Sequence, residues 1–245
     1  MRCVEVSDHL KRSLCSQKRL RNRRRLLGVS VLLLSIPLSL LSNPFFLGMG
    51  VFGFFLFLVS SLSSDKEKVL RVGLRGEEDL KERLSGMLSD EYTAFFNLPL
   101  ERGDIDCFLV GPTGAYLFDV KGHRGDILYC DEQWSQLKVG RRGRVYEGEH
   151  IKDPSLQLRR GILAIKRYLS QHGISLWIEG VIVFTDPRVR LFCERPSKGI
   201  RIIKPDELDS LFKDRKTSLK RETIEAISSL IQERWTKNIS PARGF

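Results

Sequence analysis

Hydrophobic positions recur at helical spacing in several stretches after residue 65, and short β-rich runs bounded by turn residues lie between them. The helical stripes predict helices over residues 66–88, from 153 to about 169, over 205–212 and over 220–235. The β-rich runs predict strands at 92–98, 105–110, 115–121, 126–129, 177–184, 190–193 and 200–203, and a further hairpin within 136–149. This order of elements predicts a mixed α/β sheet with helices on its faces.

Two uncharged apolar runs, residues 26–42 and 45–62, precede the α/β part, with an Asn43-Pro44 turn signal between them. Each run is close to the length that crosses the hydrocarbon core of a bilayer, so the pair predicts a transmembrane helical hairpin. A buried helical hairpin of a soluble core and a cleaved signal peptide are the alternatives. Both fit less well, because each run is apolar on all faces and no small-x-small cleavage signal follows the first.

Charge predicts the orientation of this hairpin. Residues 1–25 contain nine Lys and Arg side chains against two acids, a net charge of +7, and more cations follow the second run. The positive-inside rule therefore places both termini in the cytoplasm. The chain is expected to divide into a basic cytoplasmic tail at 1–25, a two-helix transmembrane hairpin at 26–62, an α/β domain at 66–205 and a C-terminal helical extension at 206–245.

The total charge of +11 says little about nucleic acid, because the tail alone supplies +7 and residues 26–245 supply only +4. The tail is expected to bind anionic lipid headgroups. Two local basic clusters are interpreted as solvated surface. They are Lys138, Arg141, Arg142 and Arg144, and Arg159, Arg160, Lys166 and Arg167. The five cysteines are scattered and form no CxxC pair, which argues against a disulfide framework and a zinc site and suits a reducing compartment.

The hairpin around the turn 111–114 carries Asp106, Asp119 and Lys121. If its strands pair symmetrically about the turn, Asp106 lies across from Asp119, and Lys121 shares their face. A bulge at Gly114 would shift the pairing by one residue and send Asp106 to the other face. With the symmetric register, two carboxylates are placed to bind a divalent metal. The alternative is an ordinary hairpin with a solvated edge.

Two further polar residues need an explanation. Glu77 falls inside the apolar stripe of the helix at 66–88, where a carboxylate is costly unless it is paired, hydrogen-bonded or bound to metal. The other interpretation is that Gly76 starts a new helical turn and Glu77 is an acid near its N-terminus. Gln157 lies in the first turn of the later helix, flanked by small residues, and is otherwise an ordinary surface glutamine.

Four separated motifs occur in one order: Gly76-Glu77, Gly103-Asp-Ile-Asp106, Asp119-Val-Lys121 and Pro154-Ser-Leu-Gln157. In this order they resemble the NERD family, the nuclease-related domain of the PD-(D/E)XK nuclease superfamily, over roughly residues 70–205. The resemblance implies a restriction-endonuclease-like core, so that 66–205 is a NERD-like nuclease domain. It also implies phosphodiester hydrolysis with Mg²⁺, or alternatively Mn²⁺.

The resemblance assigns roles to five residues. Asp106 and Asp119 match the metal-binding acids, and Lys121 matches the lysine of the D/ExK element. Glu77 matches the acid of the first helix, which binds metal directly or through water, and Gln157 matches the glutamine of the later helix. Asp119 departs from the family pattern, since glutamate is more common at that position and aspartate is one methylene shorter.

Two functions follow as hypotheses. The first is a membrane-anchored, divalent-metal-dependent nuclease that acts on DNA, or alternatively RNA. The second is a non-catalytic, membrane-tethered module that keeps the nuclease fold to bind nucleic acid or a protein partner. The intact Asp106, Asp119 and Lys121 set favours the first, and the small charge outside the tail favours the second.

Overall fold

The computed structural model describes residues 1–7, 9–39, 44–62, 64–100, 103–130, 133–139, 145–147, 151, 153–193, 199–213 and 219–236. The expected turn at Asn43 and the cluster members Arg141, Arg142 and Arg144 lie outside the described residues. The chain forms two compact units. One contains His9–Leu74, and the other contains Met1–Asp8 together with Arg75–Phe245.

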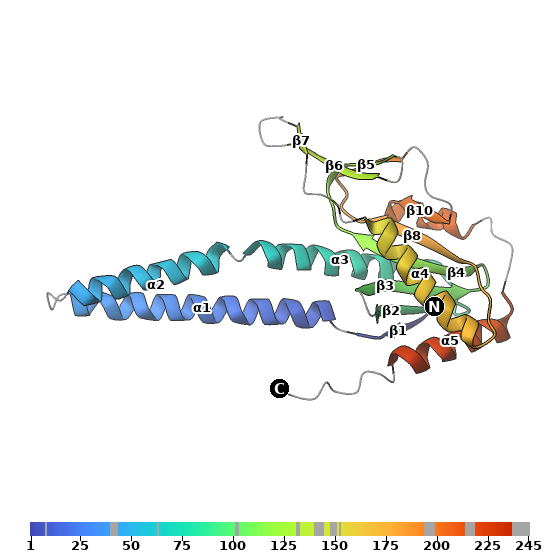
Figure 1. The fold of residues 1–245 in the computed structure, drawn as a ribbon, viewed down its shortest axis with the longest axis horizontal. Helices are drawn as coiled ribbons and strands as arrows, with labels where there is room; N and C mark the ends of the chain where they lie inside the picture. Colours follow the sequence, from blue (N-terminus) through green and yellow to red (C-terminus); the bar gives the residue numbers. More distant parts are fainter. Residues whose placement is uncertain are drawn as a thin grey trace. The chain divides into compact units, whose positions relative to one another are not determined.

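The larger unit contains a six-stranded sheet of order β1-β2-β3-β4-β8-β10 (Figure 1). The strands are β1 (Arg2–Glu5), β2 (Thr93–Pro99), β3 (Asp104–Gly111), β4 (Gly114–Lys121), β8 (Ile178–Phe184) and β10 (Ile200–Ile203). Strands β2, β3 and β4 are antiparallel neighbours, whereas β1, β8 and β10 pair in parallel with theirs. The expected mixed sheet is therefore confirmed.

A second sheet has the order β7-β6-β5-β9. Its strands are β5 (Gly125–Cys130), β6 (Gln133–Val139), β7 (Val145–Glu147) and β9 (Val189–Cys193). The antiparallel β6 and β7 pair is the hairpin expected within 136–149. Trp134 at the start of β6 donates a hydrogen bond from Nε1 to Ser155 Oγ, at 3.1 Å, and so joins this sheet to the first turn of the next helix.

Helices cover both faces of the six-stranded sheet. Leu80 and Leu84 of α3 (Ser64–Met87) and Leu208 and Leu211 of a 3₁₀ helix (Pro205–Leu211) pack on one face. On the other face, α4 (Pro154–Gln171) and α5 (Arg221–Thr236) pack against side chains of β2, β3 and β4. Figure 1 shows α4 running across the strands. The alternating side chains of the central strands thus enter two separate cores.

The smaller unit consists of α1 (His9–Ser39), α2 (Pro44–Leu62) and the start of α3. Charged side chains occupy much of it, as in the ion pair of Arg21 with Glu67. Within the described residues, none of the helices combines the length and the apolar character needed to cross a membrane. The prediction of a two-pass membrane protein with cytoplasmic termini is therefore wrong.

Candidate active site

Strands β3 and β4 pair in the symmetric register expected from the sequence. Gly111 pairs with Gly114, and the ladder continues to Cys107 opposite Phe118. Asp106 and Asp119 are the next residues on each strand, so the register without a bulge is confirmed. Beyond this point β4 remains paired with β8, up to Lys121 opposite Phe184. The backbone of Asp119 and Lys121 is therefore held by a central strand after β3 has separated from it.

Asp119 is almost fully buried, with 4% of its surface exposed. The Lys121 ammonium donates a hydrogen bond to its Oδ1 at 2.8 Å. Its Oδ2 is buried and has no hydrogen-bond partner among the described residues. Burial raises the pKa of Asp119, and the charge and hydrogen bond of Lys121 oppose that rise. One oxygen of this carboxylate is thus available to a cation.

Asp106 turns its carboxylate toward the backbone of β4. Its Oδ2 accepts a hydrogen bond from the Val120 N–H at 2.5 Å. Burial raises the pKa of Asp106 well above its ordinary value, and the negative charge of Asp119 raises it further. Lys121 and the Val120 N–H lower this pKa but do not cancel the rise. When both aspartates are ionised, Lys121 neutralises only one of the two negative charges, and the site keeps a net negative charge.

Glu77 lies on α3 near this pair, and its charge contributes to the raised pKa of Asp106. The helix is continuous from Ser64 to Met87, so Glu77 is not at a helix N-terminus and that interpretation is wrong. Gly76 allows the close approach of α3. A Cβ on Gly76 would lie 2.7 Å from Thr185 Oγ1 and 2.9 Å from Val120 Cγ1. The half-buried Glu77 follows directly after this contact.

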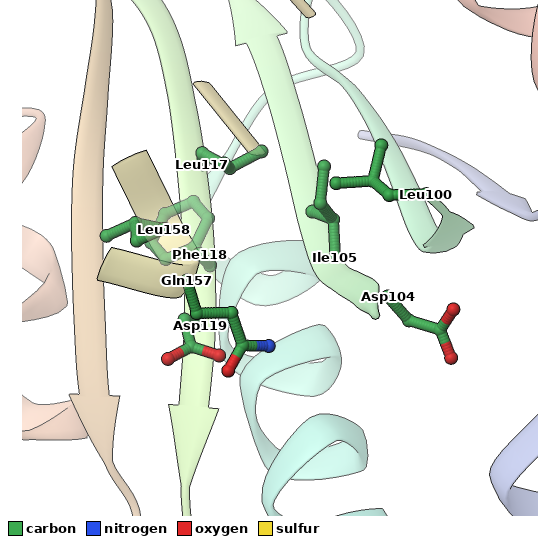
Figure 2. Close-up of a pocket in the computed structure, with 8 residues that line it drawn as sticks. All are labelled: Leu100, Asp104, Ile105, Leu117, Phe118, Asp119, Gln157 and Leu158. Atoms are coloured by element: carbon green, nitrogen blue, oxygen red, sulfur yellow. The ribbon is translucent and has the colours of Figure 1, made fainter. Parts of the chain in front are cut away.

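Gln157 reaches the site from the first turn of α4. The helix begins with Asp153 as N-cap, whose carboxylate accepts a hydrogen bond from the Leu156 N–H, and with Pro154 in its first turn. Gln157 Oε1 lies 3.5 Å from Lys121 Nζ, at the long limit of a hydrogen bond. Figure 2 shows the Gln157 amide beside the Asp119 carboxylate in a shallow pocket, with Asp104 at the start of β3 across from them.

The structure therefore brings Asp106, Asp119, Lys121 and Gln157 together, with Glu77 within electrostatic reach. No group of three or more His, Cys, Asp or Glu side chains in the described part of the chain is close enough to hold a metal ion. The donors still suit Mg²⁺, which binds through one or two carboxylates and otherwise keeps water and substrate phosphate oxygens. The unpartnered Asp119 Oδ2 is such a donor.

Two features of this site could not be found by inspecting residue types. The hydrogen-bond donor to Asp106 is the backbone of Val120, which leaves no mark in the sequence. Asp104 lines the same pocket as Asp119 and Gln157, although the sequence drew attention only to its neighbour Asp106. The GDID spacing was the available signal for Asp104.

In a comparison with protein families, residues 72–185 match the family model described as a nuclease-related domain, NERD. All five residues of the candidate site lie within that range. Neither a curated protein nor a solved structure matches the chain.

Proposed function

Because residues 72–185 form a nuclease-related domain of the PD-(D/E)XK type, we propose that this protein is a divalent-metal-dependent nuclease that hydrolyses phosphodiester bonds of DNA, or alternatively of RNA. The six-stranded sheet would then be a restriction-endonuclease-like core. The observation that carries the proposal is Asp119, which is buried beside Lys121 and Asp106 and has one oxygen without a partner.

In this proposal Asp106 and Asp119 hold the metal, and Glu77 supports it directly or through water. Mg²⁺ or Mn²⁺, when bound, would lower the pKa of a coordinated water and neutralise charge that develops on the phosphate. Burial makes the charged form of each aspartate costly, and the charge of Asp119 adds to that cost at Asp106, so a bound cation would stabilise the ionised pair.

Lys121 and Gln157 would act on the substrate. Lys121, held by Asp119 at 2.8 Å, would position the attacking water or stabilise negative charge on the phosphate. Gln157, at the start of α4, would keep the lysine in place through its Oε1 and offer its amide N–H groups to a phosphate oxygen. Both groups project from elements fixed by the packed core, as preorganised donors require.

The test is cleavage of single- and double-stranded DNA by the full chain in Mg²⁺ or Mn²⁺. Asp119→Ala and Lys121→Ala should each lower the rate on the order of 100-fold or more, because each removes a group that the transition state needs. Asp126→Ala is the matched control, since this acid lies on β5 of the second sheet and is paired with Arg190. Metal-dependent cleavage that survives both site substitutions would show that the activity belongs elsewhere.

A second candidate function is a non-catalytic module that binds nucleic acid or a protein partner. It is favoured by the absence of a close three-ligand cluster among the described residues. In that case nucleic acid would be bound and binding would weaken with salt, but no substrate would be cut in any metal. Addition of Mg²⁺ would then leave the melting temperature unchanged, whereas a resident metal site would raise it.

A further inference from the structure

Helix α4 carries four cations and no acidic residue along its 18 residues. They are Arg159, Arg160, Lys166 and Arg167. Helical spacing places Leu156, Arg160, Leu163 and Arg167 in one line on the side away from the sheet. Leu163 is 61% exposed and Leu156 is 43% exposed. The outer face of α4 is thus both basic and partly apolar.

The cations at the centre of this face are not neutralised within the described residues. Neither Arg160 nor Arg167 has a carboxylate within ion-pair distance in that part of the chain. Several arginines on other elements do have such partners, among them Arg71, Arg83, Arg188, Arg190, Arg201 and Arg221. Within the described residues, Arg160 and Arg167 thus leave their positive charge open to an anionic ligand.

An exposed tryptophan lies at the C-terminal half of the same helix. Trp177, directly before β8, has 58% of its surface exposed, whereas Trp134 and Trp235 are buried. The Lys166 ammonium lies 4.9 Å from the centroid of the Trp177 ring. Gly199 packs against the Trp177 ring as well, because a Cβ on Gly199 would lie 3.0 Å from a ring atom. The ring is therefore held in place while much of it faces solvent.

These groups lie along α4, whose first turn is at the candidate active site. Gln157 in the first turn of α4 meets Lys121 at the end of β4. Strands β4 and β8 are parallel, so Trp177, one residue before β8, lies at the opposite end of the sheet from Lys121. An 18-residue helix is about 27 Å long at 1.5 Å per residue. A helix of this length can accommodate several nucleotides along its outer face.

We propose that the surface formed by Leu156, Arg160, Leu163, Arg167 and Trp177, here called the α4–Trp177 surface, binds single-stranded nucleic acid and leads it to the candidate active site. The inference rests on the proposed nuclease function, whose substrate class it narrows. Phosphates pair with the unneutralised arginines, and unpaired bases stack on Trp177 and pack on the leucines. A duplex keeps its base faces stacked internally, so it would use the arginines alone.

The test measures binding by the full chain in EDTA, so that cleavage does not enter. Fluorescence anisotropy of labelled single-stranded and duplex oligonucleotides gives the affinities over a series of salt concentrations. Trp177→Ala should weaken single-strand binding by roughly 5- to 100-fold, while Trp177→Phe should keep most of it. Arg160→Gln with Arg167→Gln should lower the magnitude of the salt slope by about 1.4, or 0.7 per lost phosphate contact.

Arg83→Gln with Arg221→Gln is the matched control, because it removes the same charge from paired arginines on α3 and α5. It should change the affinity by less than about twofold. Equal weakening by the control pair, or single-strand and duplex affinities that are alike and unaffected by Trp177→Ala, would overturn the inference. Thermal melts of all variants check that they fold.

The outcome is separate from that of the proposed nuclease activity. If DNA is cut and Asp119→Ala stops the cutting, yet the α4 and Trp177 variants bind as the parent does, the α4–Trp177 surface is not the binding site and the nuclease stands. If nothing is cut but single-strand binding depends on Trp177 and Arg160, the surface stands and the nuclease activity falls.

Discussion

Substitution of Gly76 by alanine tests how closely α3 must approach the candidate active site. The new Cβ would lie 2.7 Å from Thr185 Oγ1 and 2.9 Å from Val120 Cγ1, both too close for unstrained contact. Both atoms belong to β-branched side chains, which have few alternative rotamers. The helix or the ends of β4 and β8 must therefore shift.

Two opposing effects set the change in the free energy of unfolding for Gly76→Ala. Alanine is favoured over glycine inside a helix by about 1 kcal/mol. Overpacking of a close contact costs about 1–3 kcal/mol. The net change for Gly76→Ala is therefore between none and a loss of about 2 kcal/mol. Gly86→Ala is the control, because a Cβ at Gly86, on the same helix, meets nothing within 4 Å. It should gain about 0.5–1 kcal/mol.

Urea denaturation followed by tryptophan fluorescence measures both variants. All three tryptophans, at 134, 177 and 235, lie in the larger unit, so the signal reports on the unit that contains the site. Gly76→Ala should unfold at a lower urea concentration than Gly86→Ala. It should also cleave DNA more slowly, because Val120 supplies the N–H that binds Asp106. A gain in stability equal to that of Gly86→Ala would refute the close approach of α3.

Three other outcomes are expected. Because the pKa values of Asp106 and Asp119 are raised, this pair binds more protons in the native than in the unfolded state of the metal-free protein, so its contribution to the free energy of unfolding should fall as pH rises above about 4. Asp106→Asn should flatten this fall in denaturation series in EDTA, and unchanged profiles would contradict the pKa assignment. Burial raises the pKa of Asp119 and Lys121 opposes it, so Lys121→Met should shift Mg²⁺ binding, followed by calorimetry, to higher pH. Val6→Ala should cost about 2 kcal/mol in a thermal melt, because Val6 is only 2% exposed, and a loss below about 0.5 kcal/mol would mean that this segment is not packed.

The sequence predicted the parts of the site that depend on local patterns. The 111–114 turn fixed the register of β3 and β4, since strand pairing across a short turn follows from its length. The interrupted apolar stripe of α3 drew attention to Glu77 because a carboxylate among leucines is unusual. The Asp-Pro start of α4 placed Gln157 at a helix N-terminus. Each signal lies within about ten residues of the feature that it predicts.

The sequence did not predict strand pairs whose partners are far apart in the chain. It also misled where the residues are apolar without a periodic pattern. Strand β1 has only four residues, mostly exposed, and gains its stability from β2, far away in the chain, so no local pattern marks it. The parallel pairing of β5 with β9 is hidden for the same reason. In residues 26–62 the apolar composition carries no helical periodicity, and it did not reveal that α1 begins at His9 within the charged segment.

Because β1 pairs with β2, the unit His9–Leu74 is an insertion between the first strand of the larger unit and the rest of that unit. The chain contributes Val6 to the core of the larger unit, leaves it for the helices, and returns along α3. Truncation before α3 would therefore remove an edge strand as well as the helices. A short linker joining residue 8 to residue 75 is the excision that would preserve the sheet. Because Arg2 and Thr93 are roughly 90 residues apart, closing that loop costs entropy, and β1 is expected to join the sheet late in folding.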